Sequence, residues 1–432
     1  MVSDSRQAVG DARPPAIRIL MVAGGTGGHI FPALAVAEEL RQRGENSGAP
    51  YRIEFLGTHR PLEAKLIPAA GFPLRTVDAA GLKGIRGIQR LRNLWVLPRT
   101  ALVTAGILRD FRPQVVVGVG GYLAGPVMLE AALVGIPTVL IEPNARPGFT
   151  NRLLAPVVRI AALGFAETAP FYGKKARVTG LPVRRAFFDI PPRALAPALL
   201  PVGEATQPGV AVSPFTILVV GGSQGSRAIN QVVVKCLPLL VHESGGGADG
   251  DADVGPGFSP ERADREVGTT SASSGLKPGP TGAGAMRIIH QTGEHDYNEI
   301  LNAYQEQGLV AEVHAFIDDM PGTLAQADLV ISRAGATAVA ELAAAGRAAL
   351  LVPFPGAADQ HQLENARAME KAGAARVIVQ SELTPERLAK EIRELMANPA
   401  ALTGMETSAR GLARPDAAER LADLIQNLAR SK

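Results

Sequence analysis

Short runs of apolar residues alternate along the chain with longer segments in which apolar residues recur every three or four positions. The first runs, IRILMVA (17–23) and YRIEFLG (51–57), stand on either side of the segment PALAVAEELRQRG (32–44). A short uninterrupted apolar run is typical of a strand buried on both faces, and a period of 3.6 residues is typical of a helix with one buried side. The alternation predicts a parallel β-sheet covered by helices on both faces.

This strand–helix alternation runs to about residue 187 and starts again at Phe215. Its later strand-like runs fall at 73–79, 114–121, 137–144, 159–165 and 176–182, and then at 216–222, 286–293, 313–318, 327–335, 348–355 and 375–381. The openings of the two halves also align without a gap, Leu20–Gly28 against Ile217–Gly225. We therefore predict an α/β protein of two doubly wound domains in tandem, with a ligand-binding cleft between them.

Composition marks where the segments of the chain begin and end. Proline, alanine, glycine and serine concentrate where the strand–helix pattern is interrupted, and such stretches contribute few apolar residues to a core. The predicted segments are a flexible N-terminus (1–15), a first domain (16–187), a linker (188–214), a second domain (215–414) with a disordered insertion (242–285), and a C-terminal helix expected to pack across the domain junction (415–432).

Bulk composition excludes several classes of protein. The 44 basic and 41 acidic residues leave a net charge of +3, which is too small a bias for a nucleic-acid-binding protein. The single cysteine, Cys236, rules out a disulfide framework and fits a reducing compartment. The N-terminus lacks the apolar core of a secretory signal, and no apolar run reaches the ~18 residues that would span a bilayer. We expect a cytoplasmic protein that binds no nucleic acid.

Two glycine-rich segments, GGTGGH (24–29) and GGSQGS (221–226), each follow a predicted strand and precede a predicted helix. Free N–H groups at a helix start bind diphosphates, and the Thr26 and Ser223 hydroxyls would each add a hydrogen bond. Neither segment is a Walker A motif, because no lysine follows the glycines, and neither has the glycine spacing of a dinucleotide fingerprint. Each alone is equally consistent with a tight turn, whereas one in each domain favours a shared anion site.

Two titratable residues, one in each predicted domain, are candidates for chemistry. His29 follows the first loop, where the positive helix end would lower its pKa and keep it a neutral base. The alternative for His29 is a hydrogen bond to the loop backbone. Glu341, on an otherwise apolar predicted helix, either binds the hydroxyls of a sugar or pairs with a cation such as Arg333.

Further polar residues cluster at another predicted helix start in the second domain. They either recognise hydroxyl groups or reflect ordinary capping of the helix by its first aspartate. The cluster comprises Asp359, Gln360, His361, Gln362 and Asn365. The adjacent acids of FIDDM (316–320) lack the spacing of a metal-binding motif, so capping of the following turn is favoured there.

Several segments in a fixed order carry a resemblance to a known family. They are GGTGGHIFPALAVA, GVGGYLAGP, EPNARPGFTNR, TGLPVR, GGSQGS, FIDDM, SRAGATAVAELAAAGRAALLVPFP and DQHQLENA. With them the chain resembles the MurG family of peptidoglycan glycosyltransferases, which transfer N-acetylglucosamine from UDP to a lipid-linked muramoyl-pentapeptide. The resemblance implies a GT-B fold, in which two Rossmann-like domains face a deep cleft, with the acceptor held by the first domain and the UDP-sugar mainly by the second.

The resemblance also implies contact residues for both substrates. The residues that would bind UDP-N-acetylglucosamine, through the diphosphate, uracil, ribose or sugar, are Thr26, Gly27, Gly28, Asn144, Arg184, Ser223, the backbone of Ile317, Glu341 and Gln362. Tyr122 and His29 would line the acceptor side.

The implied reaction is inverting attack by the muramoyl 4-hydroxyl of the undecaprenyl-linked acceptor on the anomeric carbon, with release of UDP. His29 is the candidate general base, a role that typically contributes ~10²–10⁴-fold to the rate. Loop N–H groups, helix dipoles and Arg184 would stabilise charge on the leaving diphosphate. Nothing in the sequence requires a metal ion or another cofactor.

Residues 82–109 are basic and apolar, with Trp95 among them and no acidic residue between Asp78 and Asp110. Such a segment can lie on an anionic membrane surface, each cation near the surface contributing ~1 kcal/mol. We expect a peripheral protein on the cytoplasmic face of the inner membrane; the alternative is a solvated helix packed on the sheet.

Other functions are weighed against this one. A glycosyltransferase acting on a glycerolipid would use the same donor site with a different acceptor. A non-catalytic UDP-sugar-binding scaffold could lose half of the site, whereas candidates are present in both halves. A nicotinamide-dependent dehydrogenase is disfavoured, because no acidic residue is placed to bind the ribose.

Overall fold

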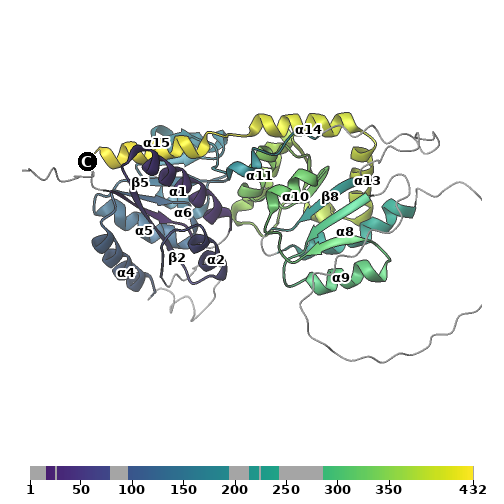
Figure 1. Ribbon diagram of the computed structural model, residues 1–432, viewed down its shortest axis with the longest axis horizontal. Coiled ribbons are helices and arrows are strands. Elements are labelled where there is room, and N and C mark those ends of the chain that lie inside the picture. Colours follow the sequence, from purple (N-terminus) through teal and green to yellow (C-terminus); the bar gives the residue numbers. More distant parts are fainter. Residues whose placement is uncertain are drawn as a thin grey trace, which may run out of the picture.

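The computed structural model describes residues 16–24, 27–77, 96–193, 214–222, 225–242 and 286–431. The predictions for the N-terminus, the insertion, most of the linker and the first half of the basic segment therefore lie outside the described residues. The described chain forms two α/β lobes side by side (Figure 1).

The first lobe contains a seven-stranded parallel sheet in the order β3-β2-β1-β4-β5-β6-β7. The first strand in the chain pairs with two neighbours in this sheet, with Ile17 opposite Tyr51 and Ile19 opposite Val115. Its strands are β1 (Ile17–Val22), β2 (Tyr51–Gly57), β3 (Leu74–Thr76), β4 (Val115–Gly118), β5 (Thr138–Glu142), β6 (Ile160–Leu163) and β7 (Ala176–Val178). Its helices are α1 (Gly27–Ser47), α2 (Pro61–Ala69), α4 (Val96–Phe111), α5 (Gly121–Leu133), α6 (Phe149–Leu154) and α7 (Ala169–Tyr172).

The second lobe repeats this plan with six parallel strands in the order β10-β9-β8-β11-β12-β13. The strands are β8 (Phe215–Val220), β9 (Met286–Gln291), β10 (Ala311–His314), β11 (Leu329–Ser332), β12 (Ala349–Leu351) and β13 (Ala375–Val377). The helices are α8 (Arg227–His242), α9 (Tyr297–Glu306), α10 (Met320–Gln326), α11 (Ala336–Ala345), α12 (His361–Lys371), α13 (Pro385–Met396) and α14 (Pro399–Leu412). The tandem arrangement predicted from the alternation is confirmed.

Both faces of the central strands are buried, which explains their uninterrupted apolar sequence. Ile19 and Met21 of β1 pack on one face with residues of α1, and Leu20 and Val22 pack on the other face with residues of α4 and α5. Since successive side chains of a strand point to opposite faces, a sheet covered by helices on both sides needs apolar residues at every position.

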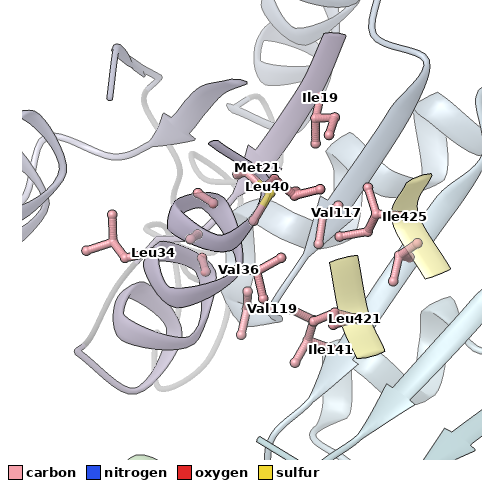
Figure 2. Packing of buried hydrophobic residues seen from close by; sticks show 14 of the residues in the cluster. Ile19, Met21, Leu34, Val36, Leu40, Val117, Val119, Ile141, Leu421 and Ile425 are labelled. Atoms are coloured by element: carbon pink, nitrogen blue, oxygen red, sulfur yellow. The ribbon is translucent and has the colours of Figure 1, made fainter. Parts of the chain in front are cut away.

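The last helix, α15 (Ala417–Arg430), returns to the first lobe, as Figure 1 shows in yellow. Its Leu421 and Ile425 join the core formed by β1 and α1 (Figure 2). Burying side chains of this size contributes about 1.5–3 kcal/mol each. Arg43 of α1 adds an ion pair with Asp423 at 2.5 Å. The chain thus crosses between the lobes a second time, which ties the second lobe to the first.

One predicted strand extends further along the chain than the strand in the structure. The run VHAFID (313–318) predicted a strand there, but β10 ends at His314. The chain turns away because the Ile317 N–H donates to the Gln291 side chain and Asp319 caps α10.

Candidate active site

The candidate site lies where the strand order of each sheet reverses. In the first sheet the reversal falls between β1 and β4, and in the second between β8 and β11. Loops that leave the carboxyl ends of such strands diverge to opposite faces and open a crevice, which is the usual ligand site of doubly wound sheets. Both glycine loops found in the sequence follow the first strand of these pairs, β1 and β8.

At the first reversal, His29 of α1 meets the loop that follows β4. A Cβ added to Gly121 would lie 3.1 Å from the Gly24 carbonyl oxygen and 3.7 Å from His29 Cε1. The backbone of Gly121 has a φ of +82°, a conformation that glycine adopts readily. The close approach therefore depends on glycine, and it packs the His29 ring against the loop that follows β4.

Burial lowers the pKa of His29, and His361 of α12 lowers it further by charge repulsion. The Gly24 carbonyl and the Glu63 carboxylate act in the opposite direction but are the weaker influences on balance. The direction agrees with the sequence prediction, although burial rather than the helix end is the main cause. His29 Nδ1 is buried and has no hydrogen-bond partner. A neutral imidazole with a buried unpaired nitrogen suits a general base.

At the second reversal, the loop between β8 and α8 is packed tightly. A Cβ added to Gly225 would lie 1.9 Å from the Thr292 carbonyl oxygen, so no side chain fits there. Gln291 at the end of β9 donates from Nε2 to the Gly222 carbonyl at 3.0 Å. Its Oε1 accepts from the Ile317 N–H at 3.0 Å. One glutamine thus fixes both the glycine loop and the segment that the resemblance assigns to uracil binding.

The two reversal points meet across the lobes. Thr337 Oγ1, in the first turn of α11, donates to the Gly28 carbonyl at 3.2 Å. Asn365 of α12 accepts from the Ala145 N–H at 2.8 Å and donates to Asn144 Oδ1 at 3.2 Å. The starts of helices from both lobes therefore face one shared site, as the cleft prediction requires.

Glu341 lies one turn beyond Thr337 on α11. Burial raises its pKa to about 7, and Arg184 of the first lobe lowers it by a smaller amount. Arg184 is held over the rings of Phe31 and Phe187, at 5.1 and 5.0 Å from the ring centres, and its Nε is buried without a hydrogen-bond partner. A carboxyl and a guanidinium thus lie near each other, one from each lobe, with hydrogen-bonding capacity left at the guanidinium.

Asn144 is held in place by a buried carboxylate at the end of β5. Glu142 is fully buried and accepts hydrogen bonds from the Asn144 N–H at 3.1 Å, the Gly148 N–H at 3.1 Å and Asn151 Nδ2 at 2.8 Å. The Tyr172 hydroxyl also donates to it at 3.3 Å. Burial raises the pKa of Glu142 despite these donors. The loop that carries Asn144 is thereby folded around one carboxyl group.

The remaining predicted residues differ in how they are held. Gln362 accepts from the Phe354 N–H at 3.0 Å through Oε1. Tyr122, at the start of α5, is 51% exposed and free to meet a second substrate. Gly27 opens α1. Thr26 and Ser223 lie outside the described residues, so their hydroxyls stay predictions.

Two alternatives weighed in the sequence are decided by these contacts. Arg333 does not pair with Glu341: its guanidinium donates to the carbonyls of Val352 and Pro353 and to Gln380. The capping of α10 by the FIDDM segment is confirmed, since the Gly322 N–H donates to Asp319 Oδ1 at 3.0 Å.

Capping by Asp359 is wrong. The residue at the N-cap of α12 is Gln360, and the Asp359 carboxylate instead pairs with Arg152 of the first lobe.

The sequence analysis missed buried residues that pack beside the two glycine loops and fix their surroundings. Glu63 is fully buried beside Gly24 and accepts a hydrogen bond from the Thr58 hydroxyl at 2.8 Å. Asn230 of α8 donates to the Thr292 carbonyl at 3.0 Å and so fixes the wall against which Gly225 packs. A single acid, glutamine or asparagine beside a glycine loop has no spacing pattern that marks it, and Gln291 was missed for the same reason.

Two doubly wound lobes that meet at the reversal points of their sheets have the architecture of the GT-B class, and comparison with known families identifies a glycosyltransferase of that class. The family model of the glycosyltransferase family 28 N-terminal domain matches residues 19–162, and that of the glycosyltransferase family 28 C-terminal domain matches residues 216–421.

Curated relatives extend the match to nearly the whole chain. A protein of Solibacter usitatus is 40% identical over 96% of this chain and 97% of its own length, and one of Myxococcus xanthus is 39% identical over 95% and 93%. Both are named UDP-N-acetylglucosamine–N-acetylmuramyl-(pentapeptide) pyrophosphoryl-undecaprenol N-acetylglucosamine transferase. The crystal structure of Acinetobacter baumannii MurG is 30% identical, with a TM-score of 0.66 over 96% of this chain and all of that one.

The chain belongs to the MurG family of N-acetylglucosaminyltransferases. The glycosyltransferase of kitacinnamycin, 19% identical with a TM-score of 0.63, shares the fold alone.

Proposed function

We propose that the protein transfers N-acetylglucosamine from UDP-N-acetylglucosamine to the 4-hydroxyl of the muramoyl unit of an undecaprenyl-pyrophosphoryl pentapeptide, with inversion at the anomeric carbon. The observation that carries the proposal is the hydrogen bond between Thr337 and Gly28, which joins the reversal points of the two sheets. Relatives about 40% identical over almost their whole length carry the name of this transferase.

In this reaction His29 takes the proton from the attacking hydroxyl. Its lowered pKa keeps the imidazole neutral near pH 7, so it can accept a proton without first losing one. Tyr122 is exposed nearby on the first lobe, where the acceptor would approach.

The leaving UDP needs stabilisation of its growing negative charge. The first turn of α11 presents backbone N–H groups, and Arg184 supplies a fixed positive charge. The N–H groups of the glycine loops would add to them. Glu341, on the same helix, would accept hydrogen bonds from the ribose hydroxyls. No step in this scheme requires a metal ion or another cofactor.

We also propose that the first lobe rests on an anionic membrane surface, where the lipid-linked acceptor is held. The packed helices α4, α5 and α6 expose large apolar side chains: Leu102 is 76% exposed, Leu133 77% and Leu153 64%. Exposed apolar side chains of this size on neighbouring helices are typical of interaction surfaces. None of the helices in the described part of the chain has the length and apolarity to cross a bilayer.

Vesicle sedimentation tests the membrane proposal. Leu102→Glu and Leu153→Glu should each weaken binding to vesicles containing phosphatidylglycerol. Val310→Glu is the matched control, because Val310 is 76% exposed on the second lobe and should leave binding unchanged. Equal binding by all three variants, or binding that ignores anionic lipid content, would rule this surface out.

The reaction itself is tested with labelled UDP-N-acetylglucosamine and a short-chain muramoyl-pentapeptide lipid analogue. Formation of the β-linked disaccharide would support donor, acceptor and stereochemistry together. A diacylglycerol acceptor run in parallel identifies a glycerolipid transferase. Tight UDP-N-acetylglucosamine binding without product from either acceptor would identify a non-catalytic scaffold.

A further inference from the structure

The turn in front of α12 has an unusual backbone. Asp359 has a φ of +53° and Gln360 a φ of +56°, so two successive non-glycine residues are left-handed. Few non-glycine residues adopt this conformation, and they keep it only where surrounding contacts impose it. Contacts around this turn must therefore hold Asp359 and Gln360 in the left-handed conformation.

The Asp359 carboxylate reaches across to the first lobe. Arg152 Nη2 of α6 lies 2.9 Å from Asp359 Oδ2, and the two side chains are 32% and 28% exposed. A partly screened guanidinium–carboxylate pair is stronger than a fully exposed one. Asp359 gives α12 no cap, since the N-cap position is Gln360.

The same helix start is held at a second point. Asn365, six residues after Asp359, bonds to Ala145 and Asn144, which belong to the loop that leads into α6. Between these two attachments lie His361, whose charge acts on His29, and Gln362. Both attachments run from one segment of the first lobe to one helix of the second.

We propose that the Arg152–Asp359 ion pair is a latch between the lobes that holds the strained turn and thereby positions His361 and Gln362 in the site. Arg152 and Asp359 are positioning residues, because they act through the helix start rather than on the reacting atoms. The proposal rests on the transferase function proposed above.

A double-mutant cycle tests the latch in the full-length protein. Arg152→Gln and Asp359→Asn should each lower kcat/KM for UDP-N-acetylglucosamine by about tenfold, and the double variant should lose no more than either single variant. The reversed pair, Arg152→Asp with Asp359→Arg, should recover part of the loss. Hydrogen exchange of the α12 amides should become faster in each single variant.

Two controls separate the latch from other effects. Asp359→Gly removes the carboxylate but suits a positive φ, so it should keep the turn without the ion pair and recover most of the activity that Asp359→Asn loses. Activity as low as that of Asp359→Asn would show that the ion pair does not act by holding the turn, and would overturn the proposal. Arg287→Gln breaks an ion pair with Glu312, 2.6 Å long and within the second lobe, and should leave both readouts unchanged.

The outcomes also separate this proposal from the function on which it rests. Losses that multiply in the double variant, or single variants with wild-type kinetics and exchange, would overturn the latch while the transferase function stands. A wild-type protein that makes no product would overturn the function, and α12 exchange would then still report on the ion pair.

Discussion

Replacing Glu341 by glutamine tests both the stability cost of burying this carboxyl and its proposed role in donor binding. Burial raises the pKa of this carboxyl from 4.5 to about 7. A carboxyl whose ionisation is opposed by burial destabilises the folded chain whenever it is charged. Glu341→Gln keeps the size and the hydrogen-bonding oxygen but removes the charge, so the free variant should be more stable than the wild type.

The magnitude follows from the pKa difference. Each pKa unit corresponds to 1.36 kcal/mol, so the shift from 4.5 to about 7 limits the penalty to about 3 kcal/mol. For a domain of roughly 150–250 residues, 1 kcal/mol moves the melting temperature by about 2–4 °C. The variant should melt up to about 10 °C higher at alkaline pH.

The pH dependence has a definite sign. Between pH 4.5 and about 7 the folded protein holds a proton on Glu341 that the unfolded chain has released, so wild-type stability falls as pH rises through this window. Below pH 4.5 the penalty is absent, and above about pH 8 it is constant. The advantage of the glutamine variant should therefore be under ~1 kcal/mol at pH 5 and largest above pH 8.

Chemical denaturation at pH 5 and pH 8.5 measures the difference in unfolding free energy between the variant and the wild type. Calorimetric titration with UDP-N-acetylglucosamine measures donor affinity. Donor affinity should fall by about tenfold or more in the variant, because a charged acceptor of hydroxyl hydrogen bonds is lost. Glu370→Gln, at an exposed position of α12, is the control and should change neither quantity. A stability advantage that is the same at both pH values would refute a buried, strained carboxylate.

Three further predictions concern the reaction and the loops. His29→Ala should lower kcat by at least ~10²-fold while UDP-N-acetylglucosamine still binds, and near-normal turnover would remove His29 from the mechanism. Gly225→Ala should abolish donor binding because its Cβ would meet the Thr292 carbonyl oxygen at 1.9 Å, whereas Gly404→Ala in α14, with open space around the added carbon, should fold and bind normally in the same titration. Turnover should be unchanged by EDTA; a loss that Mg²⁺ restores would show that a metal ion takes part.

The fold was predictable because the apolar runs report burial directly. Strand β4, for example, has the sequence VVVG and is buried at every position, as expected of a sheet covered on both faces. The glycine loops were also predictable in position, since each must lie between a strand and a helix. The end of β10 was not, because it depends on the Gln291 side chain from another strand.

The contacts between the lobes could not be predicted from the sequence for a similar reason. Asn144 and Asn365 are 221 residues apart, and nothing in either neighbourhood marks the other as its partner. The sequence indicated the polar cluster at the start of α12, but it offered capping by Asp359 as one of two interpretations, because capping can be judged from local sequence alone. Its ion pair with Arg152 exists only once both lobes have folded and docked.

Some polar side chains of the candidate site already have hydrogen-bond partners in the protein and others have none, and this difference indicates which of them contribute to substrate affinity. Asn144, Thr337 and Gln362 already have protein partners, so a ligand that bonds to them exchanges one hydrogen bond for another and gains little. His29 Nδ1 and Arg184 Nε are buried without partners. Leaving such a group unpaired costs about 1–3 kcal/mol, and a substrate that pairs with it recovers that cost. In the proposed arrangement the donor would pair with Arg184 and the acceptor with His29, so each substrate would recover the cost of one unpaired group when it binds.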